Sequence, residues 1–236
     1  MRKLAPRLAI VLATLLSTCA MTALAQNYQA DINSTSALLK QNPGSETNRV
    51  RLAQLYYLLG AQQAAGNKHA AAVESFRSGL NTLQEQNHTI ARSNTAYQAL
   101  WYGQGYSYRA LGQEERAIPP LEQLAANFPK LLKGRYLLGL TQLESGNPVQ
   151  MSKGVDTLAA LAKADTGTDG RAARRAALRW AYNYGCVLAN EGKGKEAAAL
   201  MVKLNRAGLA EGADDNDEAA LLLYGAGYFK QQSADY

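Results

Sequence analysis

The sequence predicts an all-α fold, an α-solenoid of stacked antiparallel helix pairs. Three observations lead to this prediction. A large residue, a glycine four positions later and an alanine twelve positions after that glycine recur along the chain. Apolar residues within the recurring segments follow the three- and four-residue spacing of one helical face. Glycine or proline stands where the helices of a pair would have to end.

The first 25 residues are expected to be a signal peptide and not part of the fold. Its basic start consists of Arg2, Lys3 and Arg7. An apolar run begins at Leu8, and Ala23-Leu24-Ala25 supplies the small residues that a signal peptidase reads. We therefore expect cleavage before Gln26 and a periplasmic or secreted mature chain over 26–236, without a transmembrane span.

Two alternatives for this segment are less favoured. An uncleaved anchor would have to use 18 uncharged residues, the lower limit for spanning a bilayer. A lipid on Cys19 would need a lipobox, in which Thr18 is a poor residue before the cysteine. Cleavage would also leave 22 basic and 19 acidic residues, a net charge of +3.

After the leader, the sequence predicts one lone helix, four two-helix units and a last helix. Their expected ranges are 27–42, then 53–86, 98–131, 132–165 and 178–211, and finally 218–234. The lone helix ends at Asn42-Pro43-Gly44 and would cover the open face of the first unit, as the terminal elements of stacked repeats do.

The unit over 98–131 has the clearest pattern. Its apolar and aromatic positions recur at steps of three, four and seven: Leu100, Trp101, Tyr108, Leu111, Ile118, Leu121 and Leu124. Gly112 falls where the first helix must end and can adopt the left-handed conformation of a helix C-terminus. Asn127-Phe128-Pro129 closes the second helix, because proline lacks the amide that a continuing helix needs.

The other units repeat parts of this pattern. They are marked by Tyr56, Gly60, Ala72 and Phe76, then by Gly139, Val155 and Leu158, and then by Gly185, Ala197, Met201 and Leu204. An incomplete pattern around Gly225 and Tyr228 marks the last helix. A glycine inside a helix costs about 1 kcal/mol relative to alanine. Its recurrence at Gly60, Gly105, Gly139 and Gly185 therefore predicts that helices approach each other closely there.

This pattern resembles the tetratricopeptide repeat family, whose 34-residue unit is a pair of antiparallel helices. The residues that carry the resemblance best are Trp101, Gly105, Tyr108, Ala117, Leu121, Leu124 and Pro129. It covers most of the mature chain, and it departs from the family where Met151 replaces a small residue and where Gln63, Gln142 and Leu188 replace a tyrosine. The resemblance implies a right-handed superhelix with an inner groove for extended or helical peptides.

Composition and motifs argue against several other functions. A net charge of +3 is a weak field for nucleic-acid binding. Two cysteines and two histidines are too few for a disulfide framework or a Cys/His metal site, and no cofactor is expected. No catalytic motif is present, so we expect a protein that is not an enzyme. The acidic segments 165–170 and 214–218 are interpreted as a turn and a helix start, not as calcium sites.

A tyrosine stands four residues after the start of each predicted unit. These are Tyr57, Tyr102, Tyr136 and Tyr182, with Tyr106 one helical turn beyond Tyr102. The family resemblance implies that this position faces the inner groove, where tyrosines would offer a large area and a hydroxyl to a bound peptide. Packing of these tyrosines between helices as ordinary core residues is an equally good interpretation.

A basic stripe is expected on one helix of the unit over 178–211 and the residues before it. It comprises Arg171, Arg175 and Arg179, spaced four apart, with Arg174 beside them. A solvated helix face is the favoured interpretation, and a site for an anionic ligand is the alternative.

The sequence thus favours a non-catalytic protein-interaction scaffold of the bacterial envelope, part of an envelope complex, that binds a protein or peptide in a tyrosine-lined groove. One alternative is the accessory repeat region of an envelope enzyme such as a peptidase or lytic transglycosylase. The other is binding of an anionic glycan or lipid through the arginine stripe.

Overall fold

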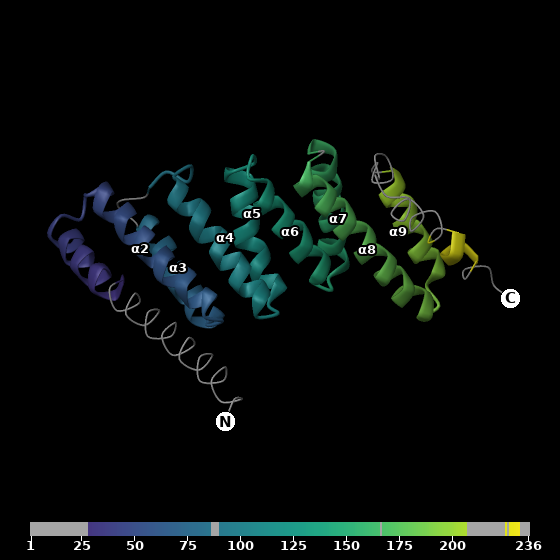
Figure 1. The fold of residues 1–236 in the computed structure, drawn as a ribbon, viewed down its shortest axis with the longest axis horizontal. Coiled ribbons are helices and arrows are strands. Elements are labelled where there is room, and N and C mark those ends of the chain that lie inside the picture. The colour runs from purple at the N-terminus through teal and green to yellow at the C-terminus, as the bar shows by residue number, and fades with distance from the viewer. Residues whose placement is uncertain (1–27, 86–89, 166, 207–224, 226, 232–236) are drawn as a thin grey trace, which may run out of the picture. The chain divides into compact units, whose positions relative to one another are not determined.

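The computed structural model describes residues 28–85, 90–165, 167–206, 225 and 227–231, and its regular structure in these ranges is entirely α-helical (Figure 1). Residues 28–41 and 227–231 are helical. Between them lie α2 (Glu46–Ala65), α3 (His69–Leu83), α4 (Thr95–Ala110), α5 (Glu114–Asn127), α6 (Leu132–Glu144), α7 (Pro148–Ala164), α8 (Thr168–Asn190) and α9 (Gly194–Arg206). The expected signal peptide, the acidic segment 214–218 and most of the expected last helix lie outside the described residues.

The chain divides into two compact units, with the boundary between Gln113 and Glu114. This boundary falls between α4 and α5, inside the segment 98–131 that the sequence pattern assigns to one repeat. In the first unit α2 packs against α3 and α3 against α4. The α2–α3 connection has only three residues, which makes the two helices antiparallel neighbours. The helix over 28–41 buries Ile32 with Leu52 and Leu55 of α2.

The second unit is built in the same way. Each helix packs against the next in chain order from α5 to α9. Its core is continuous and includes Leu143, Val155, Leu158, Leu161, Leu178, Met201, Leu204 and Phe229. The predicted fold class, an all-α array of antiparallel helix pairs packed in chain order, is confirmed.

Local signals account for several of the helix ends. Asn94 and Asn147 are N-caps, whose side-chain oxygens accept the amides of Ala96 at 2.9 Å and Val149 at 3.0 Å. Gly112, Gly146 and Gly192 follow α4, α6 and α8 with φ of 65°, 70° and 76°, the left-handed conformation predicted for Gly112.

The first pair differs by one residue. Gly66 directly follows α2 but has φ of −87°, and Asn67 takes the left-handed conformation instead, at φ of 57°. Asparagine adopts this conformation more readily than other residues that carry a Cβ.

Three of the four helix glycines named by the prediction mark close approaches between helices. A Cβ at Gly60 would lie 2.7 Å from the Phe76 ring, one at Gly139 2.6 Å from Leu158, and one at Gly185 2.5 Å from the Phe229 ring. In each case the side chain of another helix occupies the space that a larger residue would need. These contacts explain why glycine is present despite its low helix propensity.

Candidate functional site: a tyrosine cluster in the first unit

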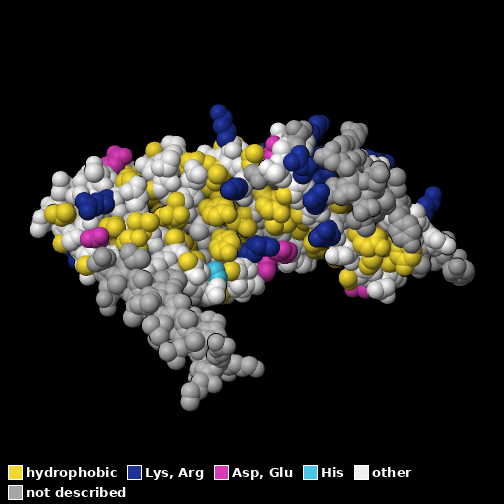
Figure 2. All heavy atoms as spheres, in the orientation of Figure 1, with side chains coloured by type: hydrophobic (Ala, Val, Ile, Leu, Met, Phe, Trp, Pro, Cys, Tyr) yellow, Lys and Arg dark blue, Asp and Glu magenta, His cyan; other side chains and the backbone are white. Residues whose placement is uncertain are grey.

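Three of the five tyrosines singled out in the sequence lie close together in the first unit. Tyr57 comes from α2, and Tyr102 and Tyr106 come from α4, one turn apart. Tyr57 and Tyr102 are half-buried, whereas Tyr106 is 45% exposed. We call these three residues the tyrosine cluster. Figure 2 shows hydrophobic side chains, a class that includes tyrosine, gathered on the surface of the first unit.

The cluster rests on Phe76 of α3. The rings of Tyr57 and Phe76 are 6.1 Å apart between centroids. Phe76 is buried and lies against two glycines, because Cβ atoms at Gly60 and Gly103 would approach its ring to 2.7 and 2.5 Å. Two glycines therefore seat Phe76 deeply between α2 and α4, and Phe76 in turn supports the tyrosine above it.

His69, the first residue of α3, borders the cluster. Its ring is 6.0 Å from that of Tyr106, in an edge-to-face arrangement. The Nδ1 atom of His69 is buried without a hydrogen-bond partner. Nothing in the repeat pattern of the sequence brings His69 to Tyr106, so its position beside the cluster could not be predicted.

The electrostatics of the cluster suit hydrogen bonding more than base catalysis. Burial raises the pKa of the Tyr102 phenol above its ordinary value, and the neighbouring Tyr106 and Tyr57 phenols raise it further. Tyr102 therefore stays protonated at neutral pH. Its neutral hydroxyl can both donate and accept hydrogen bonds, which is what a peptide backbone requires.

Tyr136 and Tyr182 have a different environment in the second unit. Both are half-buried and pack against that unit's core. The ring of Tyr182 is 6.1 Å from the ring of Phe229. Packing between helices thus accounts for part of the surface of each.

The arginines of α8 are not equally accessible. Arg171, Arg175 and Arg179 are exposed, while Arg174 is only 8% exposed.

Two further features were not expected from the sequence. One is a pocket of about 190 Å³ beside the stacked rings of Trp180 and Tyr184, which are 5.0 Å apart. Their spacing of four residues on one helix is the signal that predicts such a pair. The other is a pocket of the first unit that is lined in part by Arg49.

Asp165 serves as a local cap. Its carboxylate accepts the backbone amides of Gly167 and Gly170, both at 2.9 Å, at the start of α8. Among the described residues, no group of three or more His, Cys, Asp or Glu side chains could hold a metal ion. None of the described helices is both long enough and apolar enough to cross a bilayer.

No protein-family model and no curated protein matches the chain. Among solved structures, the chain is similar to MamA 41-end from Desulfovibrio magneticus RS-1, with 20% identity, a TM-score of 0.43, and coverage of 81% of this chain and 97% of that one. It is also similar to the MamA RS-1 ArsTM double mutant, with 17% identity, a TM-score of 0.43, and coverage of 83% and 96%. The fold class follows from the helices of the chain itself.

Proposed function

We propose that this protein is a non-catalytic interaction scaffold that binds a peptide or protein segment through the tyrosine cluster. The convergence of Tyr57, Tyr102 and Tyr106 from two helices is the observation that supports this proposal most directly. Tyrosines combine a large contact area with a hydroxyl and lose little conformational entropy on binding, which is why they are enriched at interfaces.

The different exposure of the three tyrosine side chains also favours binding. Tyr102 and Tyr57 are fixed by their neighbours, whereas Tyr106 is exposed and available to a ligand. A rigid aromatic base with an accessible edge is the arrangement from which binding hot spots are built. The protein would act in the bacterial envelope after removal of residues 1–25, in a periplasmic or secreted location.

Within this proposal, Tyr136 and Tyr182 are binding positions of the second unit by itself, through the parts of their side chains that stay exposed. The repeat resemblance supports this assignment, since the two residues occupy the same place in their repeats as Tyr57 and Tyr102. The cluster in the first unit nevertheless carries the main prediction.

The test begins with a peptide selected for binding to residues 26–236 from a random peptide library. Tyr102→Ala combined with Tyr106→Ala should weaken its binding at least about tenfold, since truncating two aromatic hot-spot residues typically costs this much or more. Circular dichroism must show unchanged helicity in the double variant.

Leu58→Ala is the matched control. Leu58 is 40% exposed and follows Tyr57 on α2, so the substitution removes a similar exposed apolar group outside the cluster. Peptide binding that survives in the double tyrosine variant, or that falls equally in the Leu58 variant, contradicts the proposed role of the cluster.

A further inference from the structure

The first unit contains a pocket that is separate from the tyrosine cluster. It is formed by residues of the helix over 28–41, of α2, and of the end of α3. Its volume is about 620 Å³, within the range of about 300–1,000 Å³ that is typical of small-ligand sites. The residues that matter most in its lining are Leu39, Lys40, Pro43, Arg49, Leu52 and Glu85.

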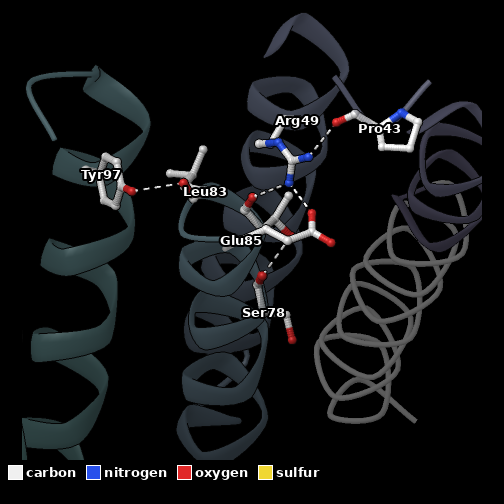
Figure 3. Close-up of polar contacts among 7 residues, drawn as sticks. Pro43, Arg49, Ser78, Leu83, Glu85 and Tyr97 are labelled. Carbon is white, nitrogen blue, oxygen red and sulfur yellow. Dashed lines mark hydrogen bonds and ion pairs between the residues drawn. The ribbon is translucent and has the colours of Figure 1, made fainter. Parts of the chain in front are cut away.

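Arg49 is a charged residue with only 1% of its surface exposed. Its Nη2 donates to the Pro43 carbonyl oxygen at 2.7 Å, and its Nη1 donates to the Thr82 carbonyl oxygen at 3.1 Å. Nη1 also donates to the Glu85 carboxylate (Figure 3). The Nε atom is buried without a hydrogen-bond partner. Two backbone carbonyls thus hold the guanidinium in place, and a carboxylate neutralises it.

Glu85 is held much less firmly than Arg49. Its side chain is 62% exposed. It lies two residues beyond Leu83, the end of α3, where the helix dipole disfavours a negative charge. A fixed, buried cation is therefore paired with a carboxylate that lies mostly in water. Another carboxylate can replace that of Glu85 with little loss, because Arg49 would keep a charged partner.

We propose that this pocket binds a carboxylate attached to an apolar group, and that the ligand carboxylate replaces Glu85 on Arg49. The pocket already accommodates one carboxylate at that position. Lys40 adds a second positive charge to its wall, and Leu39 and Leu52 supply an apolar surface. Glu85 then competes with the ligand carboxylate for Arg49. This site does not depend on the tyrosine cluster.

Two sources offer this chemistry: the C-terminal residue of a peptide and a free organic acid. Binding of N-acetyl-leucine, N-acetyl-leucine amide and hexanoate to the protein can be measured by NMR titration. We expect N-acetyl-leucine to bind, its amide not to bind, and added NaCl to weaken binding. Binding of hexanoate with similar affinity assigns the site to organic acids in general, and its failure to bind assigns it to peptide C-termini.

Variants make the exchange of carboxylates testable without touching Arg49. Glu85→Gln removes the competitor and should tighten N-acetyl-leucine binding about fivefold, the equivalent of an exposed ion pair. Lys40→Gln should weaken binding. Arg51→Gln is the matched control for Lys40→Gln. Arg51 is exposed on α2, and its loss removes the same charge outside the pocket.

The proposal is overturned if N-acetyl-leucine binds no better than its amide. It is also overturned if Glu85→Gln leaves N-acetyl-leucine binding unchanged or weakens it, since the Arg49–Glu85 pair would then only hold the fold together. The chemical shifts of the tyrosine cluster should not move in this titration, so the outcome is separate from that of the peptide-binding experiment.

Discussion

Tyr97 connects α4 to the end of α3 through its hydroxyl. The side chain is fully buried, and its hydroxyl donates to the Leu83 carbonyl oxygen at 3.1 Å (Figure 3). The same hydroxyl lies 3.3 Å from the Ile90 carbonyl oxygen. Its ring also packs on Trp101, with centroids 4.8 Å apart. A buried hydroxyl is stable only when it is hydrogen-bonded, so Tyr97 is a residue whose polar atom matters as much as its ring.

We expect Tyr97→Phe to lower the free energy of unfolding by about 0.5–1.5 kcal/mol at pH 7, because it removes a buried hydrogen bond, while the Leu83 carbonyl oxygen keeps the backbone amide of Ile90 as a donor. Urea denaturation followed by circular dichroism measures this change. Tyr106→Phe is the control, since its exposed hydroxyl is solvated in either state. A Tyr97 variant as stable as the wild type would mean that the hydroxyl contributes nothing to the fold.

The same residue predicts a pH dependence. Burial raises the pKa of Tyr97 above 10, its ordinary value, while Arg92 and Gln84 lower it in part. The folded state therefore binds the phenolic proton more tightly than the unfolded chain. The stabilising contribution is complete below pH 10 and is lost as the pH rises through the folded pKa. Above pH 10 the stability advantage of the wild type over Tyr97→Phe should shrink.

At the scale of elements, α5 contains two prolines that a helix would be expected to exclude. Pro119 and Pro120 lie inside Glu114–Asn127. Each lacks the amide that would bond four residues back, at Glu115 and Arg116. The helix persists because it buries Ile118, Leu121 and Leu124 along one face, and Pro120 is itself buried among the residues of that face. Tertiary burial therefore overrides an unfavourable local preference.

Pro119 is exposed, so replacing it removes the unfavourable backbone effect without disturbing the core. We expect Pro119→Ala to raise the free energy of unfolding by about 1–3 kcal/mol, because a proline in a helix interior costs about 3 kcal/mol relative to alanine. Thermal denaturation measures the gain. Pro129→Ala, beyond the end of α5, should give no comparable increase. A destabilised Pro119 variant would show that the ring makes contacts that outweigh its backbone cost.

The whole molecule consists of two compact units, each with its own buried core. In repeat-like proteins stability is close to a sum of local terms, because each element contacts mainly its neighbours in sequence. The packing of each helix on the next in both units has this character. A defect in one unit should therefore remain local.

Gly60→Ala tests this expectation, since its Cβ would lie 2.7 Å from the Phe76 ring. We expect a loss of about 1–3 kcal/mol from overpacking. Hydrogen exchange should then speed up in α2 and α3 and stay unchanged in α7 and α8. Gly66→Ala is the control, because its Cβ would have 3.5 Å to its nearest neighbour. Equal loss of protection in α7 and α8 would show that the chain unfolds as one cooperative body.

The sequence predicted the fold class better than it predicted the site. Apolar spacing predicted the helices over 98–131, and Gly112 and Pro129 predicted where α4 and α5 end. These signals act within one or two turns of the chain. The residue that takes the left-handed conformation after α2 could not be predicted, since both Gly66 and Asn67 tolerate it. The two prolines of α5 argue locally against the helix that forms, and only burial of its apolar face explains it.

By itself, the sequence determined that the chain folds into helix pairs and that Gly60, Gly139 and Gly185 let helices approach, because helix formation and close packing leave a periodic pattern in the residues. Only the tertiary structure decided which tyrosines meet, since Tyr57 and Tyr102 come from different helices while Tyr136 and Tyr182 lie against another core. It also decided that Arg49 pairs with Glu85, 36 residues away. Contacts between residues that far apart depend on how helices pack, and packing leaves no local signal.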